Sequence, residues 1–168
     1  MKSETEETLM KKLILVVLCL LLAAPCAVAA DHAFGPYEVT LPDGAAMEDT
    51  DGVYAIVRGN TRVVALHIDR VPDEDPAAAL VRMLPLYDAS AVLTGTLSLA
   101  DGCCGITALS ANRLGEGIDQ LTCMLLREGE LFILAGYDMQ GDEQAVTALL
   151  NELLRGVTVA GVSIVPAQ

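Results

Sequence analysis

The chain has 168 residues and a formal net charge of −13 at pH 7, and 53% of its residues are hydrophobic. Such an acidic surface repels phosphate backbones and anionic lipid headgroups, which argues against nucleic-acid binding. The sequence has no Trp and two Phe, which argues against aromatic platforms that stack on sugars or bases.

The first thirty residues have the pattern of an export signal. Lys11 and Lys12 precede residues 13–24, which are all Leu, Ile, Val, Cys or Ala. Ala29 and Ala30 lie among small residues at the spacing that a signal peptidase reads, and a polar region follows. We therefore expect cleavage after Ala29 or Ala30 and an extracytoplasmic location: secreted, periplasmic or associated with the cell envelope.

Three alternatives for this segment stay open. Residues 13–30 are uncharged, so an uncleaved membrane anchor is the first, and the chain would then touch a membrane only through it. The second is lipidation of Cys26, which Pro25 disfavours because the residue before a lipidated cysteine is small. The third is initiation at Met10, because three glutamates precede the basic pair.

Residues 31–168 are expected to form a single globular domain. They contain seven Arg, no Lys and twenty Asp plus Glu, and their length is typical of one domain. The simplest explanation of the acidic excess is solubility.

The first half of this domain predicts a strand, a hairpin and a helix. Residues 37–41 alternate and end in a turn at 42–44. Residues 53–58 and 61–69 flank Gly59-Asn60, and a two-residue turn sets Arg58 opposite Thr61 and Ile56 opposite Val63. A helix then begins at Pro76, capped by Asp75, with an apolar stripe at Leu80, Met83, Leu84 and Tyr87 and an early end or kink at Pro85.

The second half predicts an antiparallel meander and a final helix. Residues 92–99 form a strand or an extended crossover, and strands follow at 104–112, 118–127 and 131–138. Residues 131–135 are apolar throughout, so both faces of that strand must be covered. The last helix has Asp142 as its cap, Gly156 at its end and a stripe at Val146, Leu149, Leu150, Leu153 and Leu154. Residues 157–165 could add an edge strand.

Four segments stand out in this order: YEVTLPDG (37–44), VYAIVRGNTRVVALHID (53–69), VPDEDPAAALVRML (71–84) and GELFILAGYDMQGDEQ (129–144). With them, the chain resembles exported single-domain proteins of the PsbP-like and DcrB-like fold group. The resemblance implies an α+β fold in which helices cover both faces of an antiparallel sheet, an α/β/α sandwich. It also implies an accessory or binding module rather than an enzyme, and it transfers no functional residue.

The cysteines are the first candidate site. Cys103, Cys104 and Cys123 form an odd set in an exported domain, with no C-x-x-C spacing. A regular hairpin with Arg113 opposite Ile118 places Cys123 opposite Ala108, about 13 Å along the strand from Cys104, too far for a disulfide unless a bulge or a curled turn at residues 102–105 changes the path of the chain. Small buried thiols or one structural bridge are the expected role, with redox or metal chemistry as the alternative.

Other chemistry has little support in the sequence. His32 and His67 lack partners at metal-ligand spacing, and His67 is expected to be a strand residue with one hydrogen bond. Asp73, Glu74 and Asp75 lack the spacing of a calcium loop. Ser110 and Asn112 lie on a strand without a nearby base, and hydrolase and phosphate-loop motifs are absent.

The sequence therefore predicts a non-catalytic exported accessory or binding module without a cofactor, whose partner is an envelope protein or a small ligand. The alternative is a thiol-dependent envelope protein that uses Cys103, Cys104 and Cys123 in redox or metal chemistry.

Overall fold

The computed structural model describes residues 31–72, 75–100, 102–111 and 119–166. The predicted signal, Ala29 and Ala30 included, lies outside these ranges, as do Asp73, Glu74 and Asn112. Within them, no helix is long and apolar enough to cross a membrane.

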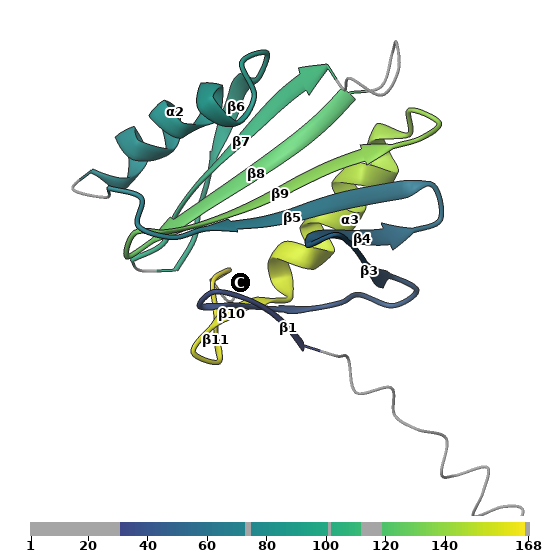
Figure 1. Ribbon diagram of the computed structural model, residues 1–168, viewed down its shortest axis with the longest axis horizontal. Coiled ribbons are helices and arrows are strands. Elements are labelled where there is room, and N and C mark those ends of the chain that lie inside the picture. The colour runs from purple at the N-terminus through teal and green to yellow at the C-terminus, as the bar shows by residue number, and fades with distance from the viewer. Residues whose placement is uncertain (1–30, 73–74, 101, 112–118, 167–168) are drawn as a thin grey trace, which may run out of the picture.

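A large antiparallel sheet organises the described residues (Figure 1). In sheet order, its seven strands there are β3 (Ala46–Thr50), β4 (Val53–Arg58), β5 (Thr61–Ile68), β9 (Glu130–Asp138), β8 (Asp119–Arg127), β7 (Cys104–Ala111) and β6 (Val92–Leu97). The predicted hairpin register is confirmed, because Arg58 pairs with Thr61 and Ile56 with Val63. Gly59 supplies the positive φ, 62°, that this tight turn requires.

One face of this sheet packs on α2 (Pro76–Tyr87). Asp75 caps the helix by accepting a hydrogen bond from the Ala78 N–H at 3.1 Å. Pro85 lies inside the helix, which ends two residues later at Tyr87, the last residue of the predicted stripe. Its predicted apolar stripe packs on residues that include Met124, Leu131 and Ile133 of the sheet.

The opposite face packs on α3 (Glu143–Arg155) and on a small second sheet. The stripe from Val146 to Leu154 is buried as predicted. The small sheet, which the sequence did not predict, consists of β1 (Asp31–Phe34), β2 (Tyr37–Thr40), β10 (Val157–Val159) and β11 (Val162–Ser163). The tail thus forms strands, but it pairs with β2 through β10 and does not extend the large sheet.

Two clusters of buried side chains fill the two faces. Along β9, Phe132 and Leu134 point toward α3, whereas Leu131 and Ile133 point toward α2. This alternation explains why residues 131–135 are apolar at every position. The predicted α+β class with an antiparallel sheet is therefore confirmed.

Gly156 at the end of α3 is required for a reason other than the expected one. Its φ is −85°, so it does not adopt the left-handed conformation that favours glycine at helix ends. A Cβ at this position would lie 2.6 Å from the Thr40 carbonyl oxygen. The close approach of α3 to β2 excludes a side chain here.

Removing the cap of α3 should lower stability without changing the fold. The Asp142 side chain accepts a hydrogen bond from the Ala145 N–H at 3.0 Å. We expect Asp142→Ala to reduce the free energy of unfolding by about 1 kcal/mol, measured by urea denaturation. Asp142→Ser, which keeps a capping oxygen, should lose far less. Equal losses in the two variants would show that the cap does not stabilise the helix.

Candidate functional site

The candidate site lies where the large and small sheets meet. A cavity of about 520 Å³ opens there, lined by Gly35, Pro36, His67, Asp69, Arg127, Glu128, Glu130 and Val159. We call it the sheet-junction pocket. Five of these residues carry ionisable side chains, and the turn between β1 and β2 together with β10 forms the opposite wall.

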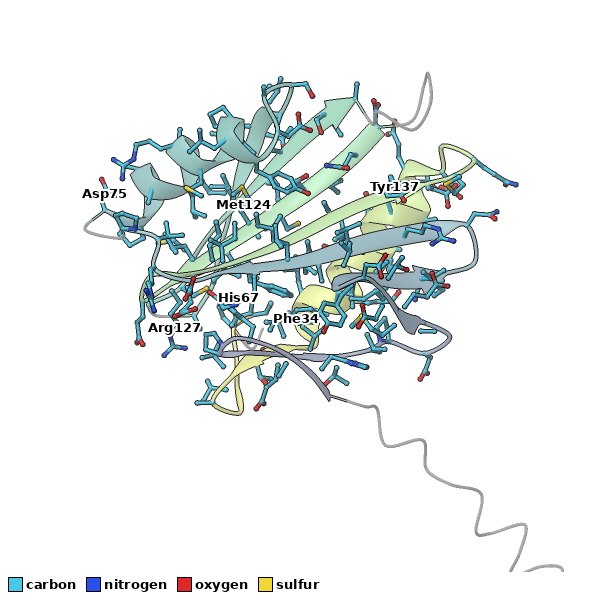
Figure 2. The ribbon with its side chains drawn as sticks, in the orientation of Figure 1. Phe34, His67, Asp75, Met124, Arg127 and Tyr137 are labelled. Atoms are coloured by element: carbon cyan, nitrogen blue, oxygen red, sulfur yellow. The ribbon has the colours of Figure 1, made fainter. Side chains whose placement is uncertain are left out.

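Strand alternation places His67, Arg127 and Glu130 on one face. They come from the adjacent strands β5, β8 and β9, and Arg127 lies directly opposite Glu130 in the β8–β9 ladder. On the same strands, Phe132 and Leu125 point to the same side as these three and are fully buried. Figure 2 shows His67 and Arg127 at the end of the large sheet that faces the small sheet.

His67 and Glu130 form the shortest polar contact of the pocket. Nε2 of His67 lies 2.6 Å from Oε2 of Glu130, and both side chains are partly exposed. Where the Glu130 carboxylate is ionised, Nε2 of His67 is the donor of this hydrogen bond, because an ionised carboxylate only accepts. His67 thus makes the hydrogen bond expected of it, and the bond tethers a carboxylate at the pocket wall.

The Arg127 guanidinium is less well paired. Its Nε is buried and has no hydrogen-bond partner among the described residues. The contact from Nε to Glu128 Oε1 is 3.7 Å, longer than a hydrogen bond. The side chain keeps 30% of its exposed area, so a positive group lines the pocket with Glu128 as its ion-pair partner at 3.7 Å.

Tyr37 ties the small sheet to the pocket. Its hydroxyl donates to the Glu130 carbonyl oxygen at 2.8 Å, and its ring is fully buried. Burial, with a smaller contribution from Cys103, raises the pKa of Tyr37 well above its usual range. The phenol therefore stays protonated and acts as a fixed donor that aligns β2 with β9.

Gly35 leaves the space that the His67 ring occupies. Its φ is 60°, and a Cβ there would lie 2.3 Å from Nε2 of His67. We expect Gly35→Ala to displace the imidazole from Glu130 and to lower the free energy of unfolding by more than about 1 kcal/mol. Urea denaturation and the imidazole NMR signals of His67 would measure both effects.

Gly44→Ala is the matched control for this prediction. Gly44 has a similar φ of 73°, but nothing lies within 4 Å of its added Cβ. It should lose stability through backbone strain alone and leave the His67 signals in place. The same His67 shift in both variants would contradict the packing of the ring on Gly35.

The structure does not join the three cysteines. All are free thiols: Cys103 and Cys123 are buried and Cys104 is partly buried. The predicted register of β7 and β8 is wrong by one residue, because Cys123 lies opposite Thr107 and not Ala108. That shift turns Cys104 toward α2 and Cys123 toward α3. A bridge between Cys104 and Cys123 is excluded because the two side chains point to opposite faces of the sheet.

Burial makes two of these thiols poor nucleophiles. Burial is the main cause that raises the pKa of Cys103 to about 11, and Cys104 makes a smaller contribution in the same direction. Arg127 opposes the shift. Burial alone raises the pKa of Cys123 to about 12. Since the thiolate is the reactive form, neither group is activated at neutral pH.

The other predicted candidates do not form a site. His32 lies in β1 opposite Val39, and no group of three potential metal ligands occurs within the described ranges. Asp75 is the cap of α2. The Ser110 hydroxyl is buried and has no hydrogen-bond partner among the described residues.

Of the pocket residues, the sequence analysis named only His67 as a candidate, and Arg127 and Glu130 are among those that it missed. A signal for them existed, because the predicted strands on either side of Glu128-Gly129 set Arg127 opposite Glu130 by the rule for two-residue turns. The contact between His67 and Glu130 spans 63 positions and required the pairing of β5 with β9.

Comparisons with known proteins identify the fold. No protein-family model and no curated protein matches the chain. The chain is similar to the solution structure of cyanobacterial PsbP (CyanoP) from Synechocystis sp. PCC 6803, with 15% identity and a TM-score of 0.55 over 82% of this chain and 96% of that one. A crystal structure from Bacteroides thetaiotaomicron VPI-5482 shares 12% identity over 79% of this chain and 49% of its own, with a TM-score of 0.46. The fold is therefore PsbP-like, as the resemblance implied, and the DcrB-like part of that resemblance stays a prediction.

Proposed function

We propose that this chain is a non-catalytic exported module that binds a small polar ligand in the sheet-junction pocket. The observation that supports this proposal is the gathering of five ionisable side chains around one cavity of about 520 Å³. Cavities of this size accommodate small organic ligands. The PsbP-like fold is compatible with binding, but a fold alone assigns no function.

The composition of the pocket favours binding over catalysis. His67 could serve as a base, yet the described lining contains no Ser, Thr or Cys for it to activate. The raised pKa of Cys103 and of Cys123 disfavours the thiol-dependent alternative. A ligand that binds without reacting is the simplest use of these groups.

A screen of small polar compounds tests the proposal. The ¹⁵N-labelled protein, purified from its host, would be titrated with mixtures of amino acids, amines, carboxylates, sugars and phosphates. We expect at least one mixture to shift the amide signals of Gly35, His67 and Glu130 in a saturable way. Turnover of a compound by the protein, or no saturable shift at these amides, would overturn the proposal.

The location outside the cytoplasm is tested by the intact mass of the same preparation. We propose that the protein recovered from its host begins near Asp31, after cleavage at Ala29 or Ala30. A retained N-terminus would instead favour a module tethered to the membrane by residues 13–30. Alkylation before the mass measurement would report the state of the thiols in the same experiment.

A further inference from the structure

Two oppositely charged residues of the sheet-junction pocket, Arg127 and Glu130, face each other on neighbouring strands but do not pair with each other. Arg127 and Glu130 are direct partners across β8 and β9, where opposite charges commonly attract each other. Here Glu130 pairs with His67 at 2.6 Å, and Arg127 contacts Glu128 at 3.7 Å, while its buried Nε has no hydrogen-bond partner among the described residues. Arg127 and Glu130 thus line the same cavity without forming an ion pair with each other.

We propose that the pocket binds a small zwitterion of the α-amino acid type. The carboxylate of the ligand contacts the Arg127 guanidinium, and its ammonium group contacts the Glu130 carboxylate. This inference rests on the proposed function and names the class of ligand. A guanidinium binds a carboxylate strongly, because its paired N–H groups donate hydrogen bonds to the two carboxylate oxygens.

The facing positions of Arg127 and Glu130 favour a compact zwitterion such as an α-amino acid. Side chains that face each other in an antiparallel ladder have Cβ atoms about 5 Å apart. An α-amino acid carries both charged groups on one carbon, so it is small enough to contact two side chains that start from neighbouring positions. Pro36 and Val159 form the apolar part of the lining and leave room for the hydrocarbon portion of the ligand.

The excess of acidic groups predicts a preference among amino acids. Asp69, Glu128 and Glu130 line the pocket against Arg127 and His67. A ligand with net positive charge should therefore bind more tightly than a neutral one. We expect L-lysine to bind several-fold more tightly than L-alanine, and L-glutamate to bind several-fold more weakly, with differences that shrink as salt is added.

NMR titrations of the purified protein test both contacts. L-alanine would be compared with ethylamine, which lacks the carboxylate, and with propionate, which lacks the ammonium group. The amides of Gly35, His67 and Glu130 would report the dissociation constants. We expect both truncated compounds to bind at least tenfold more weakly than L-alanine, and dialanine to bind more weakly because its charges lie farther apart.

Substitutions assign each charge to its partner. Arg127→Met should weaken L-alanine at least tenfold and leave ethylamine unchanged, whereas Glu130→Gln should weaken both L-alanine and ethylamine. Arg62→Met and Glu48→Gln are matched controls, because this ion pair of 3.1 Å is exposed and Arg62, on β5, points away from the pocket. Both controls should bind like the unchanged protein.

The outcomes separate this inference from the proposed function. Equal binding of L-alanine and ethylamine, or unchanged L-alanine binding in Arg127→Met, would contradict the proposal that the ligand is a zwitterion. If another compound of the screen shifts the same amides and no amino acid binds, the proposal of a zwitterionic ligand is wrong. The proposed function, binding of a small polar ligand, is then still supported. No compound bound at these amides would overturn both.

Discussion

Replacing Phe132 with alanine is expected to lower the free energy of unfolding by about 3–5 kcal/mol. The Phe132 ring is fully buried in β9. It stacks on Tyr37, with ring centroids 5.2 Å apart, and it packs at a tilt of 30° on Phe34, with centroids 5.1 Å apart. Since both partners belong to the small sheet, the substitution opens a cavity between the two sheets. Urea denaturation would measure the loss, with an unchanged slope if unfolding remains cooperative.

Two further variants locate this effect. Phe132→Leu keeps most of the apolar volume and should lose less than about 2 kcal/mol. Leu131→Ala removes a fully buried neighbour that points toward α2, so it should also destabilise the protein but leave the signals of His67 and Gly35 in place. Phe132→Ala should move these signals. A loss below about 1 kcal/mol for Phe132→Ala would contradict a packed junction between the sheets.

The large sheet was largely predictable because its signals are local. Gly59-Asn60 joins β4 to β5, and the residues on each side have the β-branched composition of strands. The apolar run at 131–135 required cover on both faces, and α2 and α3 provide it. In each case, the residues that determine the structure lie within about ten positions of one another.

The small sheet could not be predicted from such signals. Strand β10 has three residues and pairs with β2, so that Thr158 lies opposite Glu38, 120 positions away. A strand this short has no periodicity that distinguishes it from a loop.

Strand β3, at the edge of the large sheet, was missed for another reason. It carries Glu48 and Asp49 and is mostly exposed, as suits the edge of a sheet.

The pocket depends on the sheet that the sequence did not predict. From the sequence alone, His67 could only be assigned to a strand. Its partner Glu130 becomes adjacent only when β5 pairs with β9. Gly35 and Val159 form the opposite wall from the small sheet. The candidate site therefore required three-dimensional contacts, even though Arg127 and Glu130 are close in sequence.

Stability should fall steeply at alkaline pH because the buried thiols resist ionisation. The pKa of Cys103 is raised to about 11 and that of Cys123 to about 12, against an ordinary value near 9. Above pH 9 the unfolded chain releases these protons while the folded protein keeps them. The unfolded state then binds fewer protons, so the free energy of unfolding decreases as pH rises. The loss begins near pH 9 and continues to about pH 11–12.

Urea denaturation at pH 7, 9, 10 and 11 under reducing conditions would measure this effect. We expect a loss on the order of 2 kcal/mol for each buried thiol at pH 11. Tyr37 adds to it in the same direction, because burial raises its pKa as well. Cys123→Ala should flatten the profile between pH 9 and 11, whereas Cys104→Ala, at a partly buried position, should change it less. A profile that stays flat to pH 11 would contradict the burial of these groups, and with it the argument that neither thiol is poised for redox chemistry.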